Sequence, residues 1–174
     1  MKSGLFVVTG GPGTGKTTTV EHLKQSGYYA IPEASRTVSG TDPRFKGQSI
    51  SELDQKLFQE ALINYHKKQL SKDYSNKVVF SDRGLVDTIA YYKVHSLPIP
   101  DDDWKMAKTF LYDGVFLLDL LEEYCIDKFR TESPEEQIRI HRLIRETYEE
   151  LGYKPMIVPC LSVEERTNWI LERL

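Results

Sequence analysis

The sequence predicts an α/β fold in which a five-stranded parallel sheet is flanked by helices and carries one short flap. Short apolar runs punctuated by Gly or Pro alternate with helical patterns along the chain, which is typical of a parallel sheet covered by helices. The first apolar run, residues 5–8, leads at once into a glycine-rich loop and a helical pattern. With 174 residues and no internal repeat, the chain suits a single domain over residues 1–174.

The apolar runs predict five strands, at residues 5–8, 28–31, 78–81, 115–118 and 156–158. Caps and apolar faces predict the intervening helices, at residues 17–26, 51–70, 85–94, 134–151 and from 163 onward. The helix over 51–70 is expected to present one apolar face, made of Leu53, Leu57, Ala61, Leu62 and Tyr65. Residues 120–132 carry mixed charge without a clean period, so we predict a mobile flap or a frayed helical turn there.

Residues 10–17 read Gly-Gly-Pro-Gly-Thr-Gly-Lys-Thr, a complete G-x-x-x-x-G-K-T phosphate-binding loop. Glycines let the backbone curl so that consecutive N–H groups point at phosphates, and the loop ends at the positive end of a helix. Lys16 would bridge the β- and γ-phosphates of ATP or GTP, and the Thr17 hydroxyl would hold Mg²⁺. The alternative is a glycine-rich turn without a ligand, which the preceding strand and following helix disfavour. We therefore predict a P-loop NTPase fold with nucleotide contacts from Gly11, Gly13, Thr14, Gly15, Lys16, Thr17 and Thr18.

Carboxylates close three of the predicted strands, and they are Glu33, Asp82 and Asp119. In an open parallel sheet, ligands bind beyond the carboxyl ends of the strands, so these positions are candidates for chemistry. Asp82 follows apolar residues and Ser81, a loose match to the Walker B pattern in which an Asp holds Mg²⁺ directly or through water. Its alternative role is the N-cap of the helix that starts near Gly84. Asp119 fits a cap or a turn equally well.

Glu33 and Arg83 are the candidates for handling an acceptor molecule. Glu33 ends the strand that we expect beside the phosphate loop, so its carboxylate could act as a general base or orient a hydroxyl near the γ-phosphate. With Arg36 three residues on, it could instead form an exposed ion pair. Arg83 has a fork of donors that could clamp an oxyanion of the acceptor or of the transferring group. Tyr91 and Tyr92 could line an acceptor pocket, although core or surface positions are commoner for such residues.

Small-molecule kinases must keep water from the γ-phosphate, usually with a closing flap that brings a cation. Arg130, near the end of the 120–132 segment, is the candidate for that catalytic cation. A stripe at three-residue spacing follows on the next helix and is typical of a solvated face; it consists of Arg139, Arg142 and Arg145.

Composition disfavours several other classes of function. Lys plus Arg number 23 against 26 for Asp plus Glu, giving a net charge of −3 and a pI near 5.8, so we expect no stable binding of nucleic acid. Cys125 and Cys160 lack the spacing of a disulfide framework or a zinc site, and the four histidines offer no ligand pair. The N-terminus leaves no room for a signal peptide, and no apolar stretch approaches membrane-spanning length. We therefore expect a cytoplasmic protein whose only metal is Mg²⁺.

Four segments together resemble one protein family. They are residues 10–17, Pro-Glu-Ala-Ser-Arg at 32–36, Asp-Arg-Gly-Leu-Val-Asp-Thr-Ile-Ala-Tyr at 82–91, and Arg-Thr-Glu at 130–132 with the helix and strand that follow. Over nearly its whole length the chain is similar to the P-loop kinase-like AAA domains. These include the nicotinamide riboside kinase part of the bacterial NAD regulator and the TRP-channel translocation-defect proteins. The resemblance implies a Rossmann-like sheet in the order of P-loop kinases, with ATP or GTP and Mg²⁺ at residues 13–18.

Two functions are consistent with these features. The first is Mg²⁺-dependent transfer of the γ-phosphoryl group of ATP or GTP to a hydroxyl of an unidentified small molecule, such as a nucleoside. Its catalytic residues would be Lys16, Glu33, Asp82, Arg83 and Arg130, with Thr17 and Asp82 as the metal ligands. The alternative is a nucleotide-dependent regulatory switch, or a slow NTPase, that acts on a protein partner. The strand-end carboxylate, the neighbouring Arg and the predicted flap favour transfer.

Overall fold

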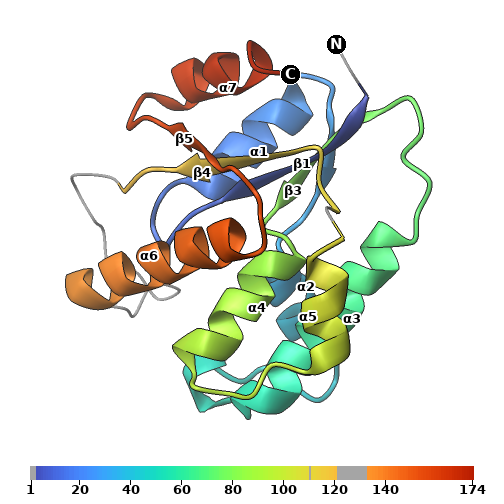
Figure 1. The fold of residues 1–174 in the computed structure, drawn as a ribbon, viewed down its shortest axis with the longest axis vertical. Coiled ribbons are helices and arrows are strands. Elements are labelled where there is room, and N and C mark those ends of the chain that lie inside the picture. The colour runs from blue at the N-terminus through green and yellow to red at the C-terminus, as the bar shows by residue number, and fades with distance from the viewer. Residues whose placement is uncertain (1–2, 110, 121–132) are drawn as a thin grey trace.

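The computed structural model describes residues 3–109, 111–120 and 133–174 (Figure 1). Its sheet has five strands in the spatial order β2-β3-β1-β4-β5, and every pair is parallel. The strands are β1 Gly4–Thr9, β2 Tyr29–Ile31, β3 Val78–Asp82, β4 Gly114–Leu118 and β5 Met156–Val158. The predicted five-stranded parallel sheet is therefore confirmed.

Helices cover both faces of the sheet. They are α1 Lys16–Gln25, α2 Ala34–Thr41, α3 Gln55–Leu70, α4 Leu85–Val94, α5 Asp101–Ala107, α6 Pro134–Glu150 and α7 Val163–Leu171, with a 3-10 turn at Ile50–Glu52. Helices α1 and α7 pack together over one face, while α4 and α6 pack together over the other (Figure 1). Helix α3 packs against α4 and carries α2 on its other side. Among the described residues, no helix is long and apolar enough to cross a membrane.

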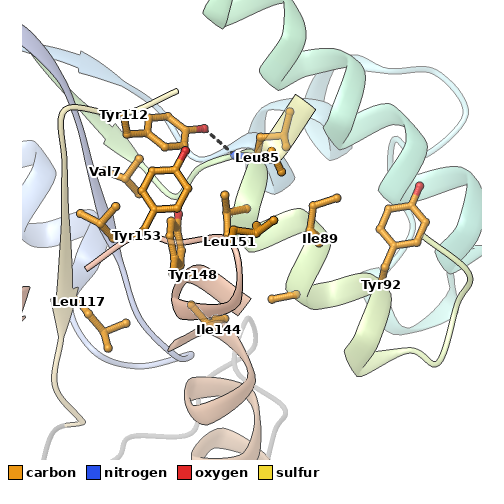
Figure 2. Close-up of a cluster of buried hydrophobic side chains, with 14 of the residues drawn as sticks. Val7, Leu85, Ile89, Tyr92, Tyr112, Leu117, Ile144, Tyr148, Leu151 and Tyr153 are labelled. Atoms are coloured by element: carbon orange, nitrogen blue, oxygen red, sulfur yellow. Dashed lines mark hydrogen bonds between the residues drawn. The ribbon is translucent and has the colours of Figure 1, made fainter. Parts of the chain in front are cut away.

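Strand β1 is apolar at consecutive positions because helices cover the sheet on both sides. Phe6 and Val8 belong to a buried cluster that includes Leu23 of α1 and Ile170 of α7. Val7 belongs to a second cluster, which α4 and α6 complete on the opposite face. Figure 2 shows this second cluster, with the Tyr112 hydroxyl accepting a hydrogen bond from the Leu85 N–H at 2.8 Å. These two clusters fix the strand that carries the glycine-rich loop.

The long helix α3 begins at Gln55, four residues later than the apolar pattern predicts. Asp54 is its N-cap, because the Asp54 side chain accepts a hydrogen bond from the Leu57 N–H at 3.1 Å. Leu57, expected on the apolar face, is 45% exposed, whereas Phe58 and Ile63 are buried instead. The other predicted apolar residues Leu53, Ala61 and Leu62 are buried, so the predicted face is present except at Leu57.

The second strand does not lie beside the loop-bearing strand, and that expectation is wrong. Strand β3 lies between them, since it pairs with β1 on one side and with β2 on the other. The burial of the two strands explains this order. Val79 and Phe80 of β3 are completely buried, whereas β2 is short and its Tyr29 is 45% exposed. A short strand with an exposed aromatic residue suits a sheet edge. Residues that follow β2 must therefore reach the loop across the end of β3.

Candidate functional site

The glycine-rich loop connects β1 to α1 and folds around its own lysine. Gly10, Gly13 and Gly15 all have positive φ angles, of 139°, 76° and 82°, which side chains with a Cβ rarely adopt. The Lys16 ammonium group donates to the Gly11 carbonyl at 2.5 Å and to Thr14 Oγ1 at 3.2 Å. Burial, with Arg83 close by, lowers the pKa of Lys16 to about 7. In a nucleotide complex, phosphate oxygens would replace these loop oxygens as the acceptors of the Lys16 ammonium group.

Asp82, at the end of β3, faces the first turn of α1. Its Oδ2 accepts a hydrogen bond from Thr17 Oγ1 at 2.7 Å, while its Oδ1 has no hydrogen-bond partner among the described residues. Asp82 is only 2% exposed, and burial, reinforced by the charge of Glu33, raises its pKa to about 6. Helix α4 is capped by Asp87, which accepts from the Gly84 N–H at 2.9 Å, so the alternative capping role of Asp82 is not observed.

A hydroxyl and a buried carboxylate oxygen without a partner fit the oxygen ligands that Mg²⁺ prefers. Thr17 and Asp82 would hold the ion, together with phosphate and water oxygens. Among the residues that the structure describes, no group of three His, Cys, Asp or Glu side chains could hold a metal by itself. The nucleotide would therefore complete the coordination of this ion.

Glu33 follows β2 and bonds two arginines at once. Its Oε2 accepts from Arg36 Nε at 3.0 Å, and its Oε1 accepts from Arg83 Nε at 3.3 Å. The pair with Arg36 exists, but Glu33 itself is only 16% exposed at its side chain, against 59% for Arg36. Burial alone would raise the pKa of Glu33, but the charges of Arg83 and Lys16 hold it below its ordinary value. Glu33 is thus an ionised carboxylate beside the phosphate loop.

Arg83 is the centre of this network. Its backbone has a positive φ of 67°, uncommon for a residue with a side chain. Its Nη1 donates to the Gly10 carbonyl and to Asp87 Oδ1, both at 3.1 Å, and its guanidinium lies 5.4 Å from the centre of the Tyr91 ring. Although burial disfavours the charge, the facing Tyr91, Asp87 and Glu33 raise the pKa of Arg83. The guanidinium is fixed between the phosphate loop and Glu33.

Asp87 is a functional residue that the sequence analysis quoted but did not interpret. Its Oδ1 also accepts from Thr9 Oγ1 at 2.5 Å, and its Oδ2 accepts from Tyr148 OH at 2.7 Å. With the bonds from Arg83 and Gly84, this buried carboxylate has four donors. Helical spacing does not relate Asp87 to Arg83, because Arg83 precedes α4 and has a positive φ, so no local pattern pointed to this role.

Three side chains from the C-terminal part of the chain hold the outside of the phosphate loop. Gln137 Nε2 donates to the Pro12 carbonyl at 2.6 Å, and His141 Nδ1 accepts from the Gly11 N–H at 3.2 Å. Arg166 of α7 donates to the Thr14 carbonyl at 2.9 Å. Since its N–H already bonds His141, Gly11 would contribute to nucleotide binding through the shape of the loop.

A cavity of about 1020 Å³ opens in front of the loop. One end is formed by residues of the loop and α1, including Gly13, Gly15, Lys16, Thr17 and Thr18. The cavity is also lined by Glu33, Arg36 and Arg83, and Arg83 bonds both the Gly10 carbonyl of the loop and the Tyr91 hydroxyl of α4. The remaining lining, which we call the far end, comes from α3, α4 and the turn before α3. The structure thus brings Lys16, Thr17, Glu33 and Arg83 to one cavity, with Asp82 bonded to Thr17 beneath it.

Comparisons with known proteins agree with this geometry. A family model described as an AAA domain matches residues 5–166. The chain belongs to the AAA domain family. This confirms the family predicted from the four sequence segments. A sequence search of curated proteins found no significant match.

Solved structures share the fold of this AAA domain. A deoxyadenosine kinase from M. mycoides, with dCMP and a flexible dCDP bound, has a TM-score of 0.66 and 18% identity, over 97% of each chain. The NadR protein in complex with NR has a TM-score of 0.64 and 20% identity, over 90% of this chain but 45% of that one. The chain therefore spans less than half the length of NadR. A shikimate kinase from Acinetobacter baumannii, in complex with shikimate, has a TM-score of 0.64 and 16% identity, over 99% and 93% of the two chains. These likenesses show the P-loop NTPase fold.

Several other sequence predictions have separate outcomes in this AAA domain. The predicted flap lies almost entirely outside the described residues, and so does Arg130, so both stay predictions. Asp119 is exposed, and its backbone N–H donates to the Val158 carbonyl at 3.0 Å. The arginine stripe is confirmed as a solvated face, made of Arg139, Arg142 and Arg145. Tyr91 lines the cavity, whereas Tyr92 is buried in the core.

Proposed function

We propose that this AAA domain is a Mg²⁺-dependent kinase that transfers the γ-phosphoryl group of ATP or GTP to a hydroxyl of a small molecule, such as a nucleoside. The observation that carries the proposal is the continuity of the cavity from the phosphate loop, past Glu33 and Arg83, to a separate wall on α3 and α4. Ligand pockets are commonly about 300–1000 Å³, so this cavity has room for an acceptor beyond the phosphates. A switch that only binds a nucleotide needs no such second compartment.

Each residue of the site has a role in the proposed transfer. The acceptor hydroxyl gives its proton to the ionised Glu33 as its oxygen attacks the γ-phosphorus, while the bond from that phosphorus to the β-phosphate oxygen breaks. Lys16 and Arg83 place positive charge beside the transferring group. Mg²⁺, held by Thr17 and Asp82, would neutralise charge on the phosphates. Arg130, predicted from the sequence, would add a further cation.

The solved structures support this reaction class because several of similar fold are named as small-molecule kinases. The chemistry of the site supports it independently. A base candidate, Glu33, and an arginine bonded to it, Arg83, line the same cavity as the phosphate loop.

The test is acceptor-dependent release of nucleoside diphosphate. The protein is incubated with Mg·ATP or Mg·GTP and a panel of nucleosides, sugars and hydroxy acids, and product formation is compared with hydrolysis without acceptor. We expect Glu33→Gln to lower transfer by roughly 10²–10⁴-fold while nucleotide affinity stays within a few-fold. Glu21→Gln is the control, because Glu21 lies on the exposed side of α1 in a pair with Lys24.

Two results would contradict the proposal. If no acceptor accelerates turnover and Glu33→Gln leaves slow hydrolysis unchanged, the regulatory switch becomes the better account. If an acceptor is phosphorylated equally well by Glu33→Gln, transfer stands but Glu33 returns to an ion pair with Arg36.

A further inference from the structure

The far end of the cavity differs chemically from the phosphate end. Helices α3 and α4, which pack against each other (Figure 1), form its walls. Helix α3 contributes Phe58, Gln59, Leu62 and His66, and α4 contributes Thr88 and Tyr91. The positions on α3 follow helical spacing, so one stripe of the helix faces the compartment. This stripe is aromatic, aliphatic and polar without formal charge.

Gln59 is a buried polar residue that the proposed transfer does not use. It is 3% exposed, it lines the cavity, and its Oε1 has no hydrogen-bond partner among the described residues. Burying an amide oxygen without a hydrogen bond is unfavourable. A ligand that forms a hydrogen bond with the Gln59 amide would remove this unfavourable burial.

Gln55, one helical turn earlier, adds a second amide to the same wall. Its Nε2 donates to the Ile50 carbonyl at 2.7 Å, which requires the amino side of the amide to face that carbonyl. Its Oε1 therefore has no partner among the described residues, and Gln55 lines the cavity. Two amide groups at i and i+4 thus offer acceptor oxygens to one ligand, and Gln59 can also offer a donor.

The walls on α3 and α4 offer no cation to an anionic acceptor, and the two arginines that line the cavity, Arg36 and Arg83, are both paired with Glu33. Burial lowers the pKa of His66 to about 4, so His66 is neutral at physiological pH. Asp87, the one acidic residue of α4 that lines the cavity, has both oxygens hydrogen-bonded. Neither α3 nor α4 contributes a Lys or Arg to the lining. A carboxylate or a second phosphate would lie here without a cationic partner from these helices.

We propose that this compartment binds the uncharged base of a nucleoside, whose amino group and adjacent ring nitrogen pair with the amide of Gln59. Gln55 offers its carbonyl to the same amino group or to the sugar, and the rings of Phe58 and Tyr91 provide apolar surface for the base. The sugar hydroxyl then extends toward Glu33. This inference rests on the proposed function for the reacting hydroxyl, but the binding does not require transfer to occur.

The test measures binding rather than turnover. Calorimetry on the whole protein, with Mg²⁺ and a non-hydrolysable ATP analogue, compares adenosine and cytidine with purine riboside, which lacks the amino group. Adenine alone, ribose alone and shikimate complete the panel. We expect adenosine or cytidine to bind roughly 10- to 100-fold more tightly than purine riboside. Ribose and shikimate should bind weakly. The affinity for adenine measures whether the base binds without the sugar.

The matched variants are Gln59→Leu and Gln69→Leu. Gln69 lies on the same helix outside the cavity, where it accepts from Lys72 Nζ at 2.7 Å. Gln59→Leu should lose roughly 10- to 100-fold in affinity for the amino-bearing nucleoside and keep its affinity for the ATP analogue. It should lose less affinity for purine riboside, which has only the ring-nitrogen contact to lose. Gln69→Leu should change none of these.

The proposal is overturned if shikimate binds more tightly than every nucleoside, if no nucleoside binds, or if Gln59→Leu keeps the parent preference for the amino group. The purine riboside comparison uses the parent chain alone, so it decides the matter even if Gln59→Leu does not fold. Selective nucleoside binding without any phosphorylation would leave this inference standing and overturn the kinase instead.

Discussion

The Asp82 carboxylate lies almost wholly out of solvent, with one oxygen bonded to Thr17 and the other without a partner among the described residues. Burial disfavours its ionised form, which is why its pKa rises from 3.8 to about 6. At neutral pH the folded protein therefore holds an unfavourable charge at the place where a divalent cation would bind. The same residue opposes stability and would serve the proposed Mg²⁺ site, a conflict that is common at functional sites.

Replacing Asp82 with Asn should therefore stabilise the nucleotide-free protein at neutral pH. Between about pH 4 and pH 6 the folded parent binds more protons than the unfolded chain, so its stability falls as the pH rises through this window. The Asn variant lacks this loss. We expect its Tm to exceed that of the parent by about 5 °C near pH 8 and by much less near pH 4. Attraction to Lys16 and Arg83 offsets part of the penalty, which keeps the difference small.

The Mg²⁺ readout completes this experiment. In the parent, Mg²⁺ should raise the Tm of the nucleotide complex further, and in Asp82→Asn this increment should largely disappear. Scanning calorimetry with and without Mg²⁺ measures both quantities. A variant that is less stable than the parent near pH 8, or that keeps the full Mg²⁺ increment, would show that Asp82 is a structural residue.

At the scale of the elements, α6 connects the phosphate loop to the buried network around Arg83. Its first turns bond the outside of the loop through Gln137 and His141. Two turns further on, Tyr148 is completely buried in the cluster of Figure 2. Its hydroxyl bonds Asp87, which in turn bonds Arg83. One helix thus positions both the phosphate-binding backbone and the arginine that faces the cavity.

Tyr148→Phe tests the second of these connections. Removing the hydroxyl leaves Asp87 with fewer donors, so Arg83 is held less firmly while the loop is untouched. We expect kcat to fall by about 10-fold, with the Kd for ATP within about twofold of the parent. Tyr153→Phe is the control, because the Tyr153 hydroxyl accepts from the Leu111 N–H at 2.9 Å and both tyrosines belong to the same core cluster. Equal losses of turnover in both variants would indicate a general packing defect.

His141 tests the first connection. Burial, followed by the charges of Lys16 and Arg145, lowers the pKa of His141 despite Asp119, so its neutral Nδ1 can accept from the Gly11 N–H at neutral pH. His141→Phe leaves that N–H without an acceptor, and we expect the Kd for Mg·ATP to rise by about 10-fold. His141→Asn places an oxygen where Nδ1 was and should recover most of the affinity. Calorimetric titration measures both, and failure of Asn to do better than Phe would mean that ring packing alone is important.

The sequence predicted elements well where a local signal was sufficient. Helix α4 and strand β5 begin and end where the pattern placed them, and the cap at Ser162 is present. Prediction from the sequence failed where the pairing of distant segments determines the structure. The place of β3 between β1 and β2 depends on which strand is buried on both sides, which no local pattern states. Likewise, the partners of Asp87 come from three separate elements, so its role could not be predicted from spacing alone.

At the scale of the whole molecule, the cavity joins two parts that are built differently. The phosphate end is rigid, because its loop is held by β1, α1, α6 and α7. Besides α3 and α4, the far end depends on the segment between α2 and α3, where only a 3-10 turn is regular and Ile50 is 47% exposed. Segments with few buried apolar contacts open more readily than a packed core. A ligand at the far end should therefore stabilise residues 42–62 most.

Hydrogen exchange followed by mass spectrometry can measure this difference between the two ends of the cavity, and the result distinguishes a kinase from a nucleotide-dependent switch. With Mg²⁺ and a non-hydrolysable ATP analogue alone, we expect slower exchange mainly in residues 10–20 and at the start of α6, because only the phosphate end gains contacts. Adding a nucleoside should then slow exchange in residues 42–62, which line the second compartment. The control is the same nucleoside with Gln59→Leu, where this second change should be lost. If the analogue alone protects residues 42–62 completely, nucleotide binding by itself closes the cavity. That behaviour belongs to a nucleotide-dependent switch, and the kinase proposal would have to be abandoned.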